Sequence, residues 1–173
     1  MFAARKSTSS EWQTFLDEFS DTLADATPRL LAISEPQSEI PRSVEKWSAK
    51  QIIGHLIDSA TNNHQRFVRA QFTDELIFPG YEQNEWVRVE HFQEKPWREL
   101  VQFWQLYNQH ILHIMKYAAE DKRTLLRQRH NLHQLASEQI KEDEPVTLEF
   151  FMRDYVDHLK NHLRQIFQVS NEG

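Results

Sequence analysis

Three histidines carry the clearest chemical signal in this sequence. His158 and His162 are four residues apart, so on a helix, which turns about 100° per residue, their imidazoles project from one face. Such a pair suits a divalent metal ion, and His55 lies in a separate apolar stretch that could bring a third imidazole to it. Three neutral imidazoles leave coordination positions for water or substrate, which is typical of a catalytic site. The alternative is that these rings are ordinary core or surface histidines.

The available ligand types restrict the metal without identifying it. The chain has no cysteine, which excludes disulfides, thiolate-bound zinc and iron–sulfur clusters. Imidazole ligands suit Zn²⁺, and Ni²⁺, Co²⁺ and Fe²⁺ fit nearly as well. A zinc ion bound by three histidines can lower the pKa of a bound water to about 7, and the thiolate of a small-molecule thiol could take the same position.

Polar residues near His55 are candidates to assist such a site. Asp58 and Asn62 lie on a related helix face, and a ligating imidazole usually donates its second N–H to a carboxylate or carbonyl. Arg66, one turn after Asn62, is a candidate for contact with an anionic substrate. The alternatives are exposed polar side chains and, for Arg66, a surface salt bridge.

The other histidines are expected to be solvated or hydrogen-bonded. His110 and His113 are three residues apart, as are His130 and His133, but neither pair has a matching third partner. The sequence also contains no glycine-rich phosphate loop, GxSxG motif or HExxH motif. The catalytic residues therefore stay unassigned.

Four long helices are predicted to position these residues. Glycine occurs only three times in 173 residues, whereas β-rich chains need many glycines for turns, so an all-α fold is expected. Apolar residues recur at helical spacing in four stretches. These helices should begin near Ser10, Ser48, Pro96 and Thr147, and Pro28 should bend or break the first one.

The connection between the second and third helices is long enough to set the topology. It has about 24 residues, against the roughly 2–8 of an antiparallel helix hairpin. Such a segment can return along a helix of about 30 Å, which predicts an up-down-down-up four-helix bundle with this long crossover between helices 2 and 3. Its aromatic residues Tyr81, Trp86 and Phe92 are expected to pack on the mouth of the bundle. The charged stretch 120–145 follows the third helix, with a short helix expected around 132–140.

Length, composition and charge limit the kind of protein. We expect a single domain over residues 1–173 with a core of about 10–168, since 39% hydrophobic and 27% charged residues are typical of a globular chain. The net charge of −6, with no long basic run, argues against nucleic-acid binding. No segment has the length of a membrane span or the pattern of a secretory signal, so we expect a cytoplasmic protein with a small-molecule substrate.

Three segments carry a recognisable pattern: WSAKQIIGHLIDSATNNHQRF at 47–67, PGYEQNEW at 79–86 and DYVDHLKNHLRQI at 154–166. Together they resemble the DinB-like superfamily, in particular its YfiT-like branch of metal-dependent hydrolases. With the helix spacing, the similarity runs from about Trp12 to Phe167. The resemblance implies an up-down-down-up bundle that binds a divalent metal, such as nickel or zinc, through His55, His158 and His162.

The resemblance has further implications and two departures. It implies a homodimer and, in some members, S-transfer chemistry with low-molecular-weight thiols as co-substrates. Gly54 stands where a second histidine often precedes the ligand, and Thr61 stands where another histidine can occur. The ligand triad survives both changes, but the surrounding hydrogen bonds and any substrate preference that those histidines carry are not inferred for this chain.

Three functional hypotheses follow from the residues and the resemblance together. The first is a metal-dependent hydrolase, and the second is a thiol S-transferase; both use a three-histidine site to activate water or a small-molecule thiol. The third is a non-enzymatic helical bundle that binds a ligand or partner. Under the enzymatic hypotheses, the candidates to orient the ligand imidazoles or the substrate are Asp58, Asn62, Arg66 and Tyr81.

Overall fold

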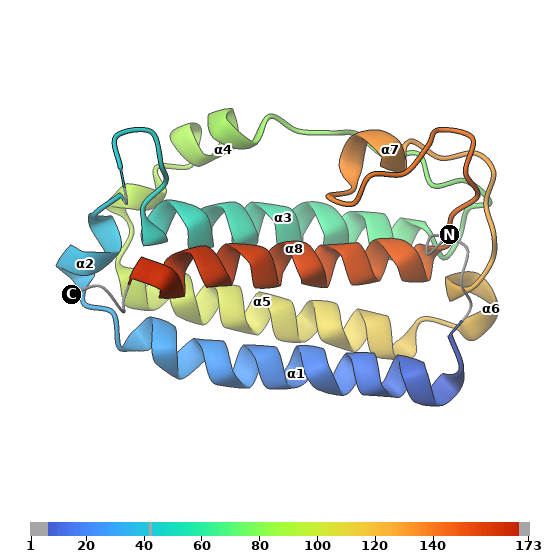
Figure 1. The fold of residues 1–173 in the computed structure, drawn as a ribbon, viewed down its shortest axis with the longest axis horizontal. Helices are drawn as coiled ribbons and strands as arrows, with labels where there is room; N and C mark the ends of the chain where they lie inside the picture. Colours follow the sequence, from blue (N-terminus) through green and yellow to red (C-terminus); the bar gives the residue numbers. More distant parts are fainter. Residues whose placement is uncertain (1–6, 42, 170–173) are drawn as a thin grey trace.

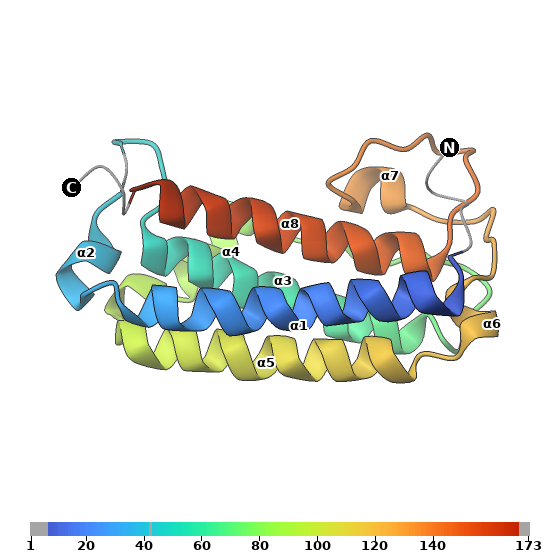
Figure 2. The same ribbon diagram turned by 60° about the horizontal axis from the view of Figure 1, so that its bottom comes forward.

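Four long helices lie side by side along the molecule (Figure 1). In the computed structural model, which describes residues 7–41 and 43–169, they are α1 (Ser9–Leu31), α3 (Ala49–Arg69), α5 (Trp97–Tyr117) and α8 (Leu148–Val169). Helices α1 and α8 run in one direction and α3 and α5 in the other (Figures 1 and 2). Helix α5 packs against α1 and α3, and α8 packs against α3 and α1. The predicted all-α bundle with up-down-down-up topology is confirmed.

Side-chain caps fix the starts of the two helices that carry the histidines. The Ser48 hydroxyl accepts a hydrogen bond from the backbone N–H of Gln51 at 3.2 Å, and the Gln51 side chain accepts from the backbone N–H of Ser48 at 2.9 Å. The Thr147 hydroxyl accepts from the backbone N–H of Phe150 at 3.0 Å. Both residues begin helices as the sequence predicts, because each supplies an acceptor for an otherwise unpaired N–H group.

Helix α1 differs from the prediction at both ends. Its N-cap is Thr8 and not Ser10, because the Thr8 hydroxyl accepts from the Glu11 N–H and the Glu11 carboxylate accepts from the Thr8 N–H. Pro28 lies inside the helix, which continues to Leu31. Proline lacks a backbone N–H, so one helical hydrogen bond is lost, but the helix is not broken there.

Short elements fill the connections between the long helices. They are α2 (Glu35–Glu39), α4 (Gln83–Val89), η1 (Phe92–Glu94), α6 (Glu120–Arg123) and α7 (Leu132–Leu135). Helix α7 is shorter than the helix expected around 132–140. Both α4 and η1 pack on α3, so the long crossover is an ordered cover over that helix. Within it, Phe92 is buried, and the half-buried rings of Tyr81 and Trp86 lie 4.9 Å apart.

The crossover and the segment before α8 are joined to each other. Leu76 and His130 form an isolated parallel bridge. The Asn131 side chain accepts from the backbone N–H of Phe78 at 3.0 Å and donates to the Phe78 carbonyl at 2.7 Å. Helices α4 and α7 therefore stand on the same side of the bundle, as Figure 1 shows.

A glycine lets the crossover approach α3 closely. A Cβ atom at Gly54 would lie 2.2 Å from Cδ2 of Phe92, much closer than such atoms can come. The Phe92 ring thus occupies the space that any side chain at position 54 would need. The residue just before His55 is small because the crossover packs there.

The apolar core runs between the four helices. Its fully buried large side chains include Phe19, Ile53, Phe67, Trp104 and Phe151. Among the described helices, none combines the length with the hydropathy that a membrane span requires.

Candidate metal centre

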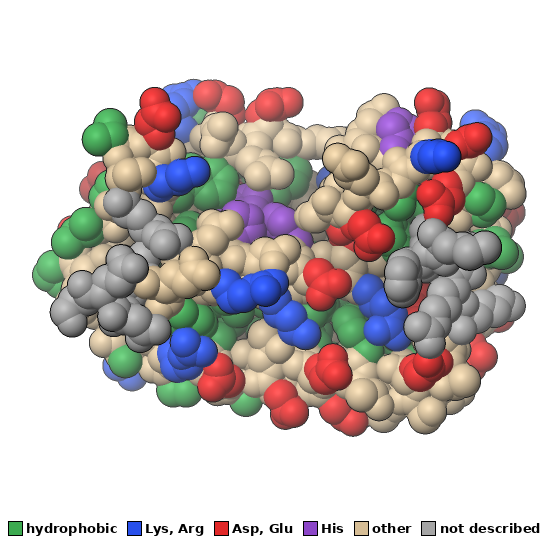
Figure 3. Space-filling view, viewed as in Figure 1, with side chains coloured by type: hydrophobic (Ala, Val, Ile, Leu, Met, Phe, Trp, Pro, Cys, Tyr) green, Lys and Arg blue, Asp and Glu red, His purple; other side chains and the backbone are tan. Residues whose placement is uncertain are grey.

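The imidazoles of His55, His158 and His162 meet between α3 and α8. The Nε2 atom of His158 lies 3.3 Å from Nε2 of His55 and 3.2 Å from Nε2 of His162. One nitrogen from each residue lies within 4.8 Å of the others, and the described residues hold no other such group of three potential metal ligands. Figure 3 shows histidine side chains in a recess over α3 and α8, between α4 and α7. The structure thus brings together the three histidines that the sequence pattern selected, here called the histidine triad.

The spacing of the triad fits a small divalent ion. A tetrahedral site with metal–nitrogen distances of about 2.0–2.1 Å places its ligand nitrogens about 3.3 Å apart. Two of the three nitrogen separations in the triad, 3.3 and 3.2 Å between Nε2 atoms, match this value, and the third lies within 4.8 Å. The donor set, three imidazoles without a thiolate or carboxylate, suits zinc and nickel equally well.

Burial keeps the triad in the form that binds metals. Burial, reinforced by the two neighbouring imidazoles, lowers the pKa of His55 to about 3. Burial and the nearby His162 lower the pKa of His158 to about 4, and burial also lowers the pKa of His162. At neutral pH all three rings are therefore uncharged, and each has a nitrogen lone pair free for a metal.

Trp47 is a part of the site that the sequence pattern missed. Its ring lies 5.0 Å from the ring of His55, and it stacks at 6.3 Å on the ring of His162. Trp47 directly precedes the N-cap Ser48, and an apolar residue at that position often packs back on its helix. That local signal could have placed Trp47 beside the first turns of α3, although not against His162 on another helix.

Two polar candidates from the sequence do not contact the triad. The Asn62 side chain donates to the backbone carbonyl of Asp58 at 2.9 Å. The Oδ2 atom of Asp58 is buried without a hydrogen-bond partner among the described residues, as are the Nδ1 atoms of His55 and His162. Burial, with a smaller contribution from Glu90, raises the pKa of Asp58 to about 7. Neither Asp58 nor Asn62 orients a triad imidazole in this structure.

A cavity of about 370 Å³ opens beside His158. Helices α3 and α8, the crossover and the segment around α7 contribute its walls. Of the four candidates for orienting an imidazole or a substrate, Arg66 and Tyr81 line this cavity. Asp58 and Asn62 do not line it. Burial raises the pKa of Tyr81 to about 12, so its hydroxyl keeps its proton at neutral pH.

Other polar residues that line this cavity were not selected from the sequence. Ser59 and Asn63 contribute to its wall on α3, and Asp154 contributes from α8. Ser59, Asn63 and Arg66 follow one another at spacings of four and three, so they share one helix face. That polar stripe on one face of α3 was a usable signal.

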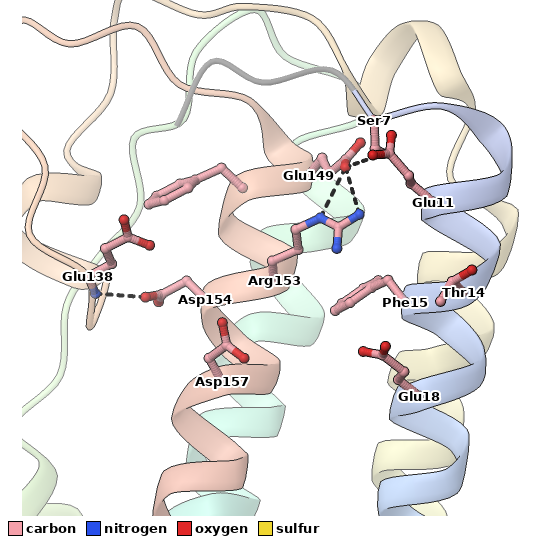
Figure 4. A pocket seen from close by; sticks show the side chains of 11 residues that line it. Ser7, Glu11, Thr14, Phe15, Glu18, Glu138, Glu149, Arg153, Asp154 and Asp157 are labelled. Atoms are coloured by element: carbon pink, nitrogen blue, oxygen red, sulfur yellow. Dashed lines mark hydrogen bonds and ion pairs between the residues drawn. The ribbon is translucent and has the colours of Figure 1, made fainter. Parts of the chain in front are cut away.

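A second and larger cavity, of about 620 Å³, lies between α1 and α8 (Figure 4). No member of the triad lines it, and most of its charged residues are acidic: Glu11, Glu18, Glu138, Glu149, Asp154 and Asp157. The basic residue among its described lining, Arg153, pairs with Glu149 at 3.0 Å, as Figure 4 shows. We assign no chemistry to this acidic recess.

The other paired histidines have ordinary environments. The backbone N–H of Leu132 donates to Nδ1 of His130 at 3.3 Å, so Nε2 of His130 donates to the Glu144 carbonyl at 2.8 Å. His110 and His113 are exposed on α5. These environments agree with the expectation of hydrogen-bonded or solvated rings.

Comparisons with known proteins agree with this fold. Residues 6–166 match the family model of the DinB superfamily. YfiT from Bacillus subtilis, described as a probable metal-dependent hydrolase with an unusual four-helix bundle topology, aligns with a TM-score of 0.77 and 17% sequence identity. The alignment covers 96% of this chain and 90% of that one, and at this identity it shows a shared fold. No match is found among curated proteins.

Proposed function

The chain belongs to the DinB superfamily, and from this membership and its histidine triad we propose that it is an enzyme dependent on a divalent metal ion. His55, His158 and His162 would hold the ion, with zinc or nickel as the proposed metals. The observation that carries this proposal is the convergence of three neutral imidazoles, one buried and two half-buried, with two Nε2 separations of 3.2 and 3.3 Å. Without a ligand, such buried polar groups lose hydrogen bonds to water and gain little in return.

The chain's own residues supply the setting for the reaction. When bound, an ion of this kind acts as a Lewis acid that lowers the pKa of a coordinated water or thiol. The triad contributes neutral ligands, and the cavity that His158 lines gives a small substrate access to this member of the triad. The protonated Tyr81 hydroxyl is available in that cavity as a hydrogen-bond donor.

The proposed reaction is hydrolysis of a small substrate. Its support is the shared fold with YfiT, which is itself described as a probable metal-dependent hydrolase. The alternative is transfer to a low-molecular-weight thiol, as the resemblance of the sequence to the family implies. The two reactions differ in their requirement for a thiol, so one assay separates them.

The metal is tested first, by elemental analysis of untagged protein. We expect close to one zinc or nickel ion per chain in the natural protein and none in His158→Ala. The control is His113→Ala, which removes an exposed histidine outside the triad. Equal metal in all three proteins would contradict the proposed ligands. Absence of metal after reconstitution with zinc and nickel would favour the non-enzymatic ligand-binding bundle.

The reaction is tested with metal-loaded protein and a panel of ester and amide substrates, with and without an added thiol. Turnover without thiol that is lost in His158→Ala supports hydrolysis. Activity that appears only with a thiol assigns the transferase reaction instead. Turnover that survives His158→Ala unchanged would show that the triad does not carry the chemistry.

A further inference from the structure

Arg66 is a buried cation without a carboxylate partner. Only 6% of it is exposed, and its guanidinium donates to the Pro79 carbonyl at 2.8 Å and to the Asn63 side-chain oxygen at 3.5 Å. In the described part of the chain, no carboxylate lies within ion-pair distance of it. A charge taken out of water without a counter-charge is unfavourable, so this arrangement needs an explanation.

The other buried cations are all compensated within the fold. Lys50 pairs with two glutamates at the end of the bundle, and Arg123 pairs with Glu149. Arg127 has no carboxylate partner among the described residues, but its two terminal nitrogens donate to several backbone carbonyls, including that of Ala70 at 2.9 Å. Arg66 makes one well-formed hydrogen bond, so most of its five N–H groups remain available.

Arg66 also borders a cavity, whereas Lys50, Arg123 and Arg127 line none of the cavities described here. It lines the cavity of about 370 Å³ that extends to His158. The neutral side chains of Ser59, Asn63 and Tyr81 lie along the same walls and offer further hydrogen bonds. The volume falls within the range of small-molecule sites.

Two carboxylates near the cavity do not neutralise Arg66. The Asp154 carboxylate accepts hydrogen bonds from the backbone N–H groups of Ser137 at 3.0 Å and Glu138 at 2.8 Å, the second of which is drawn in Figure 4. Glu82 is exposed to solvent, where water screens its charge. Among the described residues the guanidinium therefore forms no ion pair, and the Asp154 carboxylate on the same cavity wall is held by backbone N–H groups.

We propose that this cavity binds a small molecule through a carboxylate or phosphate group, which Arg66 holds while the rest of the molecule extends towards His158. The planar guanidinium presents paired N–H groups that match the two oxygens of such an anion. The anion would replace the missing counter-charge, and the donors along the wall would contact the rest of the molecule. The assignment of His158 as the reacting end rests on the proposed function, whereas the anion site does not.

The test uses two probes, glutarate and inorganic phosphate, titrated into the purified protein. Binding is followed by calorimetry and by the NMR resonance of the Arg66 side-chain Nε–H group. We expect saturable binding of at least one probe that shifts this resonance, and the preferred probe tells a carboxylate site from a phosphate site. In Arg66→Met the affinity should fall at least about tenfold. The affinity of Arg66→Lys should lie between those of the natural protein and Arg66→Met.

A matched variant and a cationic probe make the test decisive. Arg153→Met removes the arginine of the neighbouring acidic recess, which is already paired with Glu149, and should leave the affinity unchanged. Equal affinity in Arg66→Met, or no saturation by either anion, would overturn the inference. Binding of butylammonium in place of the anions would also overturn it. If Arg66→Met does not fold, an Arg66 resonance that neither anion shifts in the natural protein would contradict the inference instead.

Metal analysis of the same samples separates this inference from the proposed function. Anion binding at Arg66 in a protein that takes up no metal would leave the anion site standing and remove the metal-dependent reaction. Metal binding at the triad, together with anion binding that does not depend on Arg66, would support the metal site and remove the anion site at Arg66.

Discussion

The Nε2 atoms of His55 and His158 lie 3.3 Å apart, although 103 residues separate them in the chain. The two rings come from antiparallel helices, α3 and α8, that pack directly against each other. Burial lowers the pKa of both side chains, so they are neutral at neutral pH. The contact between the two helices should therefore be sensitive to protons.

Protonation of the triad should destabilise the metal-free protein. A histidine titrates near pH 6.5 in an unfolded chain, but the pKa values of His55 and His158 in the folded protein are about 3 and about 4. At a pH between the folded and unfolded pKa values, the unfolded state binds more protons than the folded state. The free energy of unfolding therefore falls as the pH falls from about 6.5 towards 4. Each histidine should contribute a slope of about 1.4 kcal/mol per pH unit.

Urea denaturation of the metal-free protein between pH 4 and pH 8 measures this slope. His55→Ala should make the dependence shallower, because one of the three histidines with a lowered pKa is gone. His113→Ala, at an exposed site on α5, should leave the dependence as it is. An identical slope in His55→Ala and the natural protein would contradict the buried, neutral state of His55.

Asp58 should act on stability in the opposite direction. Its pKa rises from 3.8 to about 7 in the folded state, so the folded protein binds the extra proton and loses stability as the pH rises through this range. Asp58→Asn stays neutral and should be more stable than the natural protein at pH 8, by about 1–3 kcal/mol. The difference should be small at pH 4 and level off above pH 7. A difference that is the same at every pH would contradict the burial of this carboxyl.

Gly54→Ala should strain the contact between α3 and the crossover. The new Cβ would lie 2.2 Å from the Phe92 ring, so the ring or the backbone must move, at a cost of about 1–3 kcal/mol. Gly80→Ala is the matched control, because its Cβ would meet nothing closer than Leu135 at 3.6 Å. Chemical denaturation of both variants tests this. Gly54→Ala should cost less stability in a protein that also carries Phe92→Leu, because the smaller side chain leaves room for the new Cβ. If the losses of stability from the two substitutions simply add up, the clash is contradicted.

Trp47 should report metal binding at the triad. Its ring lies 5.0 Å from the ring of His55, so a paramagnetic ion such as Ni²⁺ bound there should quench its fluorescence. Trp47→Phe should abolish most of the quenching. Trp12→Phe, near the start of α1 and against Arg123, should retain it. Quenching that persists in Trp47→Phe would place the ion elsewhere.

Periodic features of the sequence predicted the fold and the triad well. The spacing of His158 and His162 places both rings on one helix face, and the long crossover implies the direction of the third helix. These features are local or depend only on segment length, so they can be recognised without the tertiary structure. The caps Ser48 and Thr147 were predictable for the same reason, since capping depends on residues a few positions apart.

The environment of the site was less predictable because it depends on which distant residues meet. The missing counter-charge of Arg66 becomes visible only when the position of every carboxylate is known. The walls of the cavity depend on Asn131, whose side chain ties the segment before α8 to Phe78 in the crossover, 53 residues away. No local pattern encodes such a contact.

The packing of Phe92 over Gly54 has an evolutionary consequence. The two positions share one volume, so a chain cannot enlarge one without reducing the other or rerouting the crossover. Across the superfamily the two positions should therefore covary. A bulky residue at the position of Gly54 should be accompanied by a small residue at the position of Phe92, or by a displaced crossover. A substitution that adds a side chain next to the first triad histidine would then be accepted only after a permissive change 38 positions downstream.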